Sequence, residues 1–193
     1  AAPLLEIKSV AAMTDLKLPK RKGEGERWSP SLKDIPVAAK PAFWLAQNGQ
    51  PKATIVIASD ALDTNREAAA LLQNYIQKIS GATLPIVDDS QSIDGTKVLI
   101  GRSKLVDALN VKIPSGYTKA LNEEGYIIKQ IDDNLVLAGN DYRPQPAYKG
   151  SFFAVIEILQ RLGCRWYFPG EFGEVYPRSR DVSLPQLDEV VKP

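Results

Sequence analysis

The feature that most constrains the fold of this 193-residue chain is an amphipathic helix set between β-prone runs. In DTNREAAALLQNYIQKISG, residues 63–81, apolar side chains recur at the i, i+3, i+4 spacing of one helical face. Thr64 and Glu67 have the spacing of a capping box, and Gly81 can adopt the left-handed conformation that ends a helix. The predicted buried face consists of Ala68, Leu71, Leu72, Tyr75, Ile76 and Ile79.

A second amphipathic helix is predicted in SFFAVIEILQRLG, residues 151–163. Ser151 can cap its first turn, and Gly163 can end it. Its predicted buried face consists of Phe152, Val155, Ile156, Leu159 and Leu162. Two helices with one apolar face each require a common surface to cover.

Short apolar runs bounded by turn residues predict a sheet as that surface. Asn48-Gly49 is a strong hairpin signal between two runs, and Asp132-Asp133-Asn134 is a second turn. We predict that CRWYF is a last strand returning to the sheet. The predicted strands are residues 42–47, 53–58, 84–87, 97–101, 125–131, 135–139 and 164–168.

Together these elements predict an α/β (α+β) domain, a two-layer mixed sheet with two main helices packed on one face. We assign this domain to residues 42–180. Residues 1–41 mix charge, Gly and Pro with little periodicity, which predicts an N-terminal arm or irregular extension. Residues 181–193 are punctuated by proline and are predicted to be a linker.

The composition excludes several classes of function. Lys and Arg total 24 against 23 Asp and Glu, so the net charge of +1 gives no field that would attract nucleic acid. No apolar run approaches the roughly 18 residues of a membrane span. The chain has no histidine and one cysteine, so we predict no metal site and no cofactor. The opening AAPLLEIK is compatible with a mature N-terminus after signal-peptide removal, which favours an extracellular or periplasmic location.

Carboxylates are the remaining candidates for catalysis, because glycosidic bond cleavage needs two of them roughly 5 to 10 Å apart. Glu171 and Glu174 are the only acids beside an aromatic cluster. Both lie on one short loop, and no neighbour in the sequence would raise the pKa of either. We therefore predict no catalytic residue in this chain.

The aromatic cluster lies in RLGCRWYFPGEFGEVYP, residues 161–177. If its first part is a strand, Trp166 and Phe168 share one face and Tyr167 points to the other. One set packs in the core, and the set facing outward requires a sugar ring or another domain as its partner. The candidate carbohydrate-binding or interdomain surface consists of Arg165, Trp166, Tyr167, Phe168, Glu171 and Glu174.

Four segments also carry a family likeness, namely residues 53–87, 97–101, 125–140 and 149–177. In this order they resemble the N-terminal accessory domain of α-glucuronidase-like glycoside hydrolases and of related bacterial proteins, with β-N-acetylhexosaminidases as more distant relatives. The resemblance spans residues 42 to 190. It implies a zincin-like accessory domain, a mixed sheet with two helices on one face, that precedes a (β/α)8 barrel carrying the catalytic carboxylates.

The resemblance implies a non-catalytic accessory domain that supports a downstream barrel of the same polypeptide and lines its substrate cleft. We then expect no catalysis from this chain alone and a glycoside hydrolase as the whole protein. One alternative is a free-standing module that binds oligo- or polysaccharide through its aromatic residues. The other is a protein-interaction domain of a cell-surface glycan-processing complex, with the basic, Pro-containing segment 17–37 as the docking element.

Overall fold

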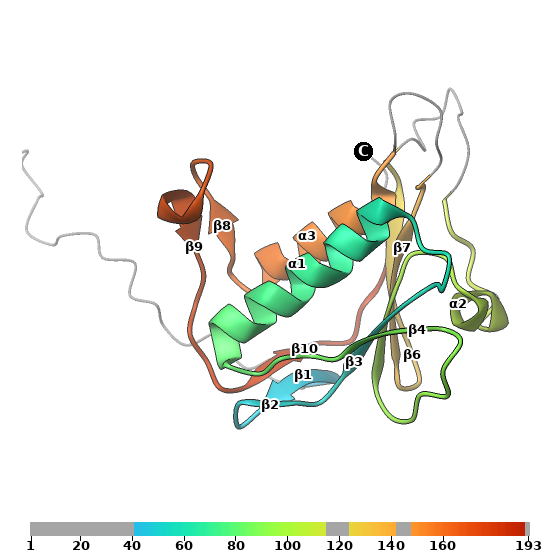
Figure 1. Ribbon diagram of the computed structural model, residues 1–193, viewed down its shortest axis with the longest axis horizontal. Coiled ribbons are helices and arrows are strands. Elements are labelled where there is room, and N and C mark those ends of the chain that lie inside the picture. The colour runs from blue at the N-terminus through green and yellow to red at the C-terminus, as the bar shows by residue number, and fades with distance from the viewer. Residues whose placement is uncertain (1–40, 115–123, 142–147, 192–193) are drawn as a thin grey trace, which may run out of the picture. The chain divides into compact units, whose positions relative to one another are not determined.

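The computed structural model describes residues 41–114, 124–141 and 148–191 (Figure 1). Its largest element is a six-stranded mixed sheet in the order β11-β6-β7-β5-β3-β4. Strands β3, β4, β5 and β7 are parallel, whereas β6 is antiparallel to both of its neighbours. The strands are β3 Thr54–Ile57, β4 Ile86–Asp88, β5 Lys97–Ile100, β6 Tyr126–Ile131, β7 Asn134–Gly139 and β11 Asp188–Val191. The mixed α+β class predicted from the sequence is confirmed.

Two helices, α1 Asp63–Ser80 and α3 Gly150–Arg161, lie side by side on one face of this sheet (Figure 1). Helix α3 contacts β6 and β7, and α1 contacts β3 and β5. Because side chains alternate along a strand, Ile55 packs toward the helices and Val56 packs toward the opposite face. The main core therefore lies between the sheet and the two helices, as predicted.

The opposite face is also partly covered. A short helix, α2 Lys104–Ala108, buries Val106 against Val56, Leu99 and Val136. The hydroxyl oxygen of Ser103 caps α2 by accepting a hydrogen bond from the Val106 N–H at 3.3 Å. No helix is predicted from the sequence here, because a helix of one turn and a half is too short to show a helical period.

The predicted helix ends are partly wrong. Helix α1 begins after Leu62, and Thr64 lies within its first turn with a buried hydroxyl that has no hydrogen-bond partner, so the capping box does not form. Helix α3 begins after Lys149, and Ser151 is already helical. The predicted end of α1 is confirmed, because Gly81 has a φ of 80° and donates its N–H to the Gln77 carbonyl.

Of the two predicted hairpins, one is confirmed and one is confirmed only at its turn. Strands β6 and β7 pair through a turn at Asp132-Asp133. Asn48 and Gly49, with φ of 54° and 75°, join β1 Phe43–Gln47 to the two-residue strand β2 Gln50–Pro51. The predicted second arm, 53–58, instead becomes β3 and enters the six-stranded sheet parallel to β4 and β5.

The two predictions at the C-terminal end of the chain are corrected. Residues 164–168 do not return to the six-stranded sheet. Within the described part of the chain, β8 Arg165–Trp166 pairs only with β9 Glu174–Val175, in a separate hairpin. Residues 182–184 and 188–191 are sheet strands, although the sequence predicts a linker from residue 181. Strand β10 Val182–Leu184 pairs with β1, and β11 pairs with β6. The predicted arm at 1–41 lies outside the described residues except for its last residue.

The backbone of β7 and the start of α3 approach each other so closely that only glycine fits. A Cβ atom on Gly150 would lie 2.4 Å from the Asn140 nitrogen, and one on Gly139 would lie 2.5 Å from the Gly150 carbonyl carbon. The two segments are joined by a hydrogen bond from the Gly150 N–H to the Asn140 carbonyl at 3.0 Å. This contact fixes where α3 begins above the sheet.

Candidate functional site

The segment singled out by the sequence forms a hairpin that projects beyond the C-terminal end of α3 (Figure 1). Its arms are β8 and β9, and its turn contains a single turn of 3-10 helix, Glu171–Gly173. The Tyr167 N–H donates to the Gly173 carbonyl at 2.9 Å, and a Cβ atom on Gly173 would lie 2.0 Å from the Phe168 carbonyl oxygen. The turn is therefore tightly closed.

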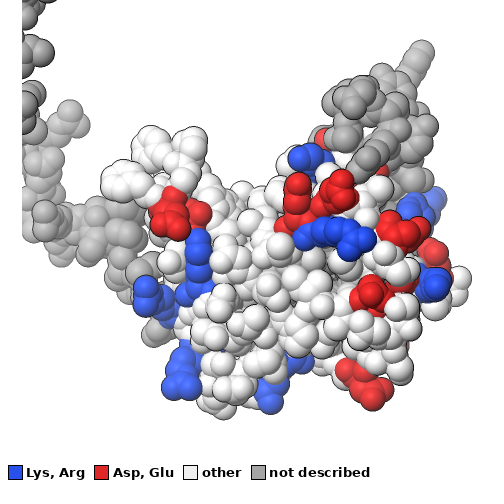
Figure 2. Space-filling model, viewed as in Figure 1, with Lys and Arg blue, Asp and Glu red and all other residues white. Residues whose placement is uncertain are grey.

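Three aromatic side chains are exposed on this turn, which we call the aromatic tip and define as residues 167–173. The exposed fractions of Tyr167, Phe168 and Phe172 are 61%, 65% and 97%. In Figure 2 the projecting hairpin is largely uncharged, with acidic side chains at its base. Burying exposed aromatic rings against a partner would be favourable, so this tip is a candidate contact surface.

The base of the hairpin is anchored on α1. Trp166 is half-buried, and its indole N–H donates a hydrogen bond to the Tyr75 hydroxyl. The two rings meet edge to face with their centroids 5.2 Å apart, and the ring of Tyr176 lies 6.2 Å from Tyr75 in the same arrangement. Tyr75 itself is 2% exposed, so the anchor belongs to the main core.

An ion pair reinforces this anchor. The ammonium of Lys78 donates to Glu174 Oε2 at 2.6 Å and lies 5.0 Å from the ring centroid of Tyr75. The hydrogen bond from Lys78 lowers the pKa of Glu174, and the same bond raises the pKa of Lys78. Glu174 is thus held as a carboxylate by its cationic partner.

The six sequence-predicted site residues fall into three groups. Tyr167, Phe168 and Glu171 lie on the aromatic tip, and Trp166 and Glu174 form its base. Arg165 caps the C-terminal end of α3 instead. Its guanidinium donates hydrogen bonds to the carbonyls of Gln160 and Cys164, both at 2.6 Å. The predicted sharing of one strand face by Trp166 and Phe168 is wrong, because β8 ends at Trp166.

One residue of the tip was missed by the sequence analysis. Phe172 lies between Glu171 and Gly173 and is the most exposed of the large hydrophobic residues that the structure describes. The signal for it in the sequence is the run GEFGE, residues 170–174. A phenylalanine flanked by glycines and acids belongs to no periodic apolar pattern, which indicates a turn with an exposed ring.

A second polar cluster lies where β7 ends and α1 and α3 begin. Asp141 accepts hydrogen bonds from the Ser151 hydroxyl at 2.6 Å, from the Ser151 N–H at 2.9 Å and from the Asn65 side chain. Ser151 in turn accepts from the Gly139 N–H at 2.9 Å. Burial raises the pKa of Asp141, while these hydrogen bonds oppose the shift. The cluster joins both helices to the sheet.

The fold and the projecting hairpin define the class of the chain, an α+β domain with two helices on one face of a mixed sheet. A solved structure with this fold is BtGH115A, a family GH115 4-O-methyl-α-glucuronidase described as specific for decorated arabinogalactans. The match has a TM-score of 0.54 and 21% sequence identity, and it covers 77% of this chain and 18% of that enzyme. This chain therefore shares a fold with less than a fifth of the enzyme's length.

Neither the known family models nor the curated proteins contain a match to this sequence. Among the described residues, no helix has the length and apolar character of a membrane span. Within the same residues, no group of three or more acidic or sulfur ligands could hold a metal ion.

Proposed function

We propose that this chain is a non-catalytic accessory domain of a carbohydrate-active enzyme. The observation that carries the proposal is the fold shared with a domain-sized part of a GH115 enzyme, 77% of this chain against 18% of that one. The resemblance noted in the sequence points to the N-terminal domain of α-glucuronidase-like and β-N-acetylhexosaminidase-like hydrolases, the zincin-like accessory domain. In this proposal a (β/α)8 barrel follows in the same polypeptide, in an extracellular or periplasmic protein.

The aromatic tip is the surface through which we propose that the domain meets the barrel and edges its cleft. A contact surface works best when it is held rigid before the partner arrives, because less conformational entropy is then lost on binding. The Trp166 to Tyr75 hydrogen bond and the Lys78 to Glu174 ion pair supply that rigidity. The lowered pKa of Glu174 is the opposite of what a catalytic acid needs, which supports a positioning role for this carboxylate.

The gene itself provides the first test. If the proposal holds, the reading frame continues past the codon of Pro193 into a (β/α)8 barrel with paired carboxylates. A stop codon directly after Pro193 would contradict it. A second, independent test is the release of sugar from glucuronoxylan and decorated arabinogalactan by the purified chain. We expect no turnover from this chain and turnover from the longer polypeptide.

The second test can be sharpened on the tip. In the longer polypeptide, Phe168→Ala with Phe172→Ala should lower the thermal stability of the barrel or raise KM, because an interdomain contact is lost. Phe153→Ala is a matched control, since Phe153 is also an exposed phenylalanine, 39% exposed, but lies on α3. Equal effects of the control and the tip variant would contradict docking through the tip.

A free-standing carbohydrate-binding module is the second candidate, and the exposure of three rings on one tight turn favours it. Aromatic rings stack on sugar rings, and the exposed Glu171 could accept hydrogen bonds from hydroxyl groups. Glycan arrays and calorimetry with the isolated chain test this candidate. Binding that is lost in Tyr167→Ala or Phe172→Ala and kept in Phe153→Ala would support it, and uniformly negative arrays would exclude it.

A further inference from the structure

Strand β11 is an edge of the six-stranded sheet, because among the described residues it pairs only with β6. An edge strand presents unpaired N–H and C=O groups that another strand can use. The aromatic tip is not involved in this edge, since β8 and β9 form a separate sheet. The edge is therefore a surface that the proposed function does not use.

The register shows which backbone groups are free. The Gln130 N–H donates to the Leu187 carbonyl at 2.9 Å, so these two residues form a hydrogen-bonded pair. In an antiparallel ladder such pairs alternate with non-hydrogen-bonded ones, so Glu189 faces Ile128 in the next hydrogen-bonded pair. Asp188 and Val190, on either side of Glu189, belong to the non-hydrogen-bonded pairs with Lys129 and Ile127. Their N–H and C=O groups therefore point away from β6, toward the open edge.

The acidic side chains of β11 do not protect this edge. Charged side chains on an edge strand usually discourage the addition of another strand. Here both carboxylate oxygens of Asp188 accept hydrogen bonds from Lys129, at 2.9 and 2.8 Å, on the neighbouring strand. The carboxylate of Glu189 is held by two nitrogens of Arg161 on α3, at 2.8 and 2.7 Å. Val190, which follows them, is 62% exposed.

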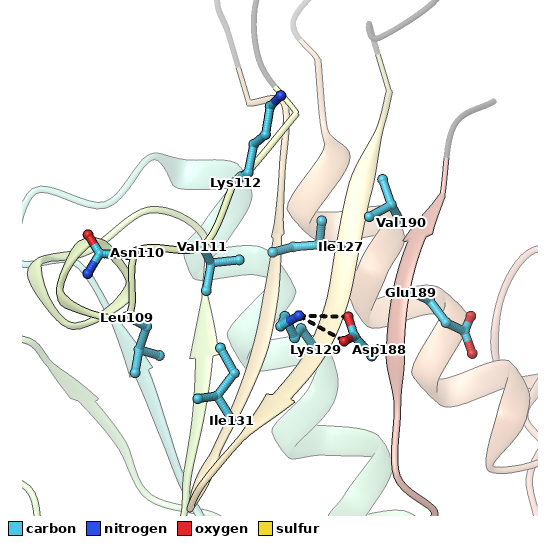
Figure 3. Close-up of a pocket in the computed structure, with 10 residues that line it drawn as sticks. All are labelled: Leu109, Asn110, Val111, Lys112, Ile127, Lys129, Ile131, Asp188, Glu189 and Val190. Atoms are coloured by element: carbon cyan, nitrogen blue, oxygen red, sulfur yellow. Dashed lines mark hydrogen bonds and ion pairs between the residues drawn. The ribbon is translucent and has the colours of Figure 1, made fainter.

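A hollow of about 220 Å³ lies on one side of β11, on the sheet face opposite to α1 and α3 (Figure 3). Val190 points into it beside Ile127, and Val111 closes it from the segment that follows α2. Lys129, which also lines the hollow, is already paired with Asp188 (Figure 3). This side offers apolar contacts to a side chain of an added strand.

A larger hollow of about 520 Å³ lies on the other side, between α3 and the end of β11. Its apolar walls are Tyr126, Phe153, Ile156 and Val191, and the charged residues that line it, among those that the structure describes, are Glu124 and Glu157. Burial raises the pKa of Glu124, although the Lys149 N–H donates to this carboxylate at 3.2 Å. Glu157 accepts a hydrogen bond from Arg161 at 2.8 Å, and the same guanidinium binds Glu189. One arginine is therefore shared by two of three carboxylates on this side of the sheet, Glu124, Glu157 and Glu189. The negative charge that remains beside apolar walls favours a basic side chain with a long aliphatic stem.

We propose that β11 accepts an extended polypeptide segment in which basic side chains alternate with β-branched apolar ones. The backbone of this segment pairs with Asp188 and Val190, which adds a seventh strand to the sheet. Its basic side chains lie beside Glu124 and Glu157, and its apolar side chains lie beside Val190 and Val111. The period of two along any strand places the two kinds of side chain on the two faces.

The test uses the whole chain and a fluorescent peptide with the sequence acetyl-Lys-Val-Lys-Val-Lys-Val-Lys-amide. We expect saturable binding by fluorescence anisotropy and at least tenfold weaker binding when Val190→Pro removes the outward N–H. Proline is tolerated at such a position because that N–H makes no bond within the sheet. Val190→Thr is the matched control, since it keeps the N–H and the branched shape, and it should bind within about twofold of the unchanged chain.

Two further variants keep the proposal testable if Val190→Pro does not fold. Val190→Lys leaves the backbone intact but adds a cation to the apolar side, and it should also weaken binding at least tenfold. Glu124→Gln combined with Glu157→Gln should weaken binding fivefold or more and flatten its salt dependence. Unchanged binding by both variants would overturn the assignment of the two faces.

Amide hydrogen exchange separates strand addition from adsorption by charge. With bound peptide, exchange of the Val190 amide should slow, whereas the Glu189 amide should be protected with and without peptide. Peptide binding without slower exchange at Val190 would overturn the proposal. So would a homodimer of the unchanged chain that becomes monomeric in Val190→Pro, because a second copy would then occupy the edge. An absence of measurable peptide binding would overturn it as well.

Discussion

The indole N–H of Trp166 donates a hydrogen bond to the hydroxyl of Tyr75, 91 residues earlier in the chain. The rings cross edge to face, with an interplanar angle of 81°. This pair connects an exposed hairpin to the buried face of α1, because Tyr75 is one of the largest fully buried side chains. The position of the aromatic tip therefore depends on the core.

Replacing Tyr75 with Phe should weaken this connection while preserving the ring. The Trp166 N–H loses its acceptor, and an unsatisfied polar group of this kind costs about 1 to 2 kcal/mol. We expect that loss in the free energy of unfolding measured by urea denaturation, and faster proteolysis within residues 167–173. Tyr167→Phe is the control, because its hydroxyl is on the exposed tip and the substitution should change stability by less than about 0.5 kcal/mol. Equal losses for both variants would contradict the anchor.

The ion pair between Lys78 and Glu174 should contribute to stability only above the acid range. The folded-state pKa of Glu174 lies below its ordinary value of 4.5. Stability from such a group is present above the unfolded pKa and is lost as the pH falls through the folded pKa. Lys78→Met should therefore cost about 1 kcal/mol at pH 7, and this difference from the unchanged chain should close between about pH 5 and pH 3.

Denaturation curves at pH 7, 5, 4 and 3 check this dependence. Glu174→Gln should cost a similar amount at pH 7, and the double variant should cost little more than either single one. A difference between Lys78→Met and the unchanged chain that persists undiminished at pH 3 would count against the ion pair.

Asp141 should show the opposite pH dependence. Its folded pKa is raised above 3.8 by burial, so the folded state binds the proton more tightly than the unfolded chain. Protonation of Asp141 therefore favours the folded state. The free energy of unfolding rises as the pH falls through the folded-state pKa, until the pH reaches the lower pKa of the unfolded chain. Asp141→Asn should lower the free energy of unfolding by about 1 to 3 kcal/mol at pH 7, because the new amide NH2 would face the donor groups of Asn65 or Ser151.

The stability difference between the unchanged chain and Asp141→Asn should therefore widen as the pH is lowered from 7 toward 4. Denaturation at three pH values within this range measures it. Ser151→Ala is a useful companion, because it removes one donor to Asp141 and one acceptor for the Gly139 N–H without changing charge. A difference that narrows on acidification would show that Asp141 is not destabilised by its charge.

Gly150→Ala should prevent α3 from starting at its present position. The new Cβ atom would lie 2.4 Å from the Asn140 nitrogen and 2.6 Å from the Gly125 carbonyl oxygen, which are backbone atoms that cannot rotate away. We expect a loss of more than about 3 kcal/mol or failure to fold. Gly95→Ala is the matched control, because its φ is 77° but no atom lies within 4 Å, so only about 1 kcal/mol of backbone strain is expected. Thermal denaturation compares the two.

The sequence predicts the elements whose signals are local. The 3.6-residue period of α1 and α3 and the tight turn between β6 and β7 are each contained in fewer than 20 residues, and all three are confirmed. Partners far apart in the chain were not predictable in this way. Nothing near Asn48-Gly49 indicates that the following run joins β5 in parallel, and nothing near residue 182 indicates that β1 needs it as a partner.

The sequence predicts which residues belong to the candidate site, but it does not predict the contacts that these residues make. The aromatic cluster and its two carboxylates identify the hairpin, but their roles depend on residues of another element. Among the described residues, Glu174 is part of an ion pair and Glu171 is not, because Lys78 on α1 contacts Glu174 alone of the two. The contact joins residues 96 positions apart, so no spacing in the sequence reveals it. Trp166 anchors the hairpin and Tyr167 lies on its exposed tip, because Tyr75, also distant in the sequence, binds Trp166.

The pairing of β1 with β10 has a consequence for the order in which the protein is made. Asn48 donates its N–H to Asp181, 133 residues later, and β1 receives Val182–Leu184 as its neighbour. A ribosome therefore releases β1 long before it releases the strand that completes its small sheet. Among the described residues, β1 has the two residues of β2 as its only strand neighbour until residues 182–184 are made, so its small sheet is completed late in synthesis.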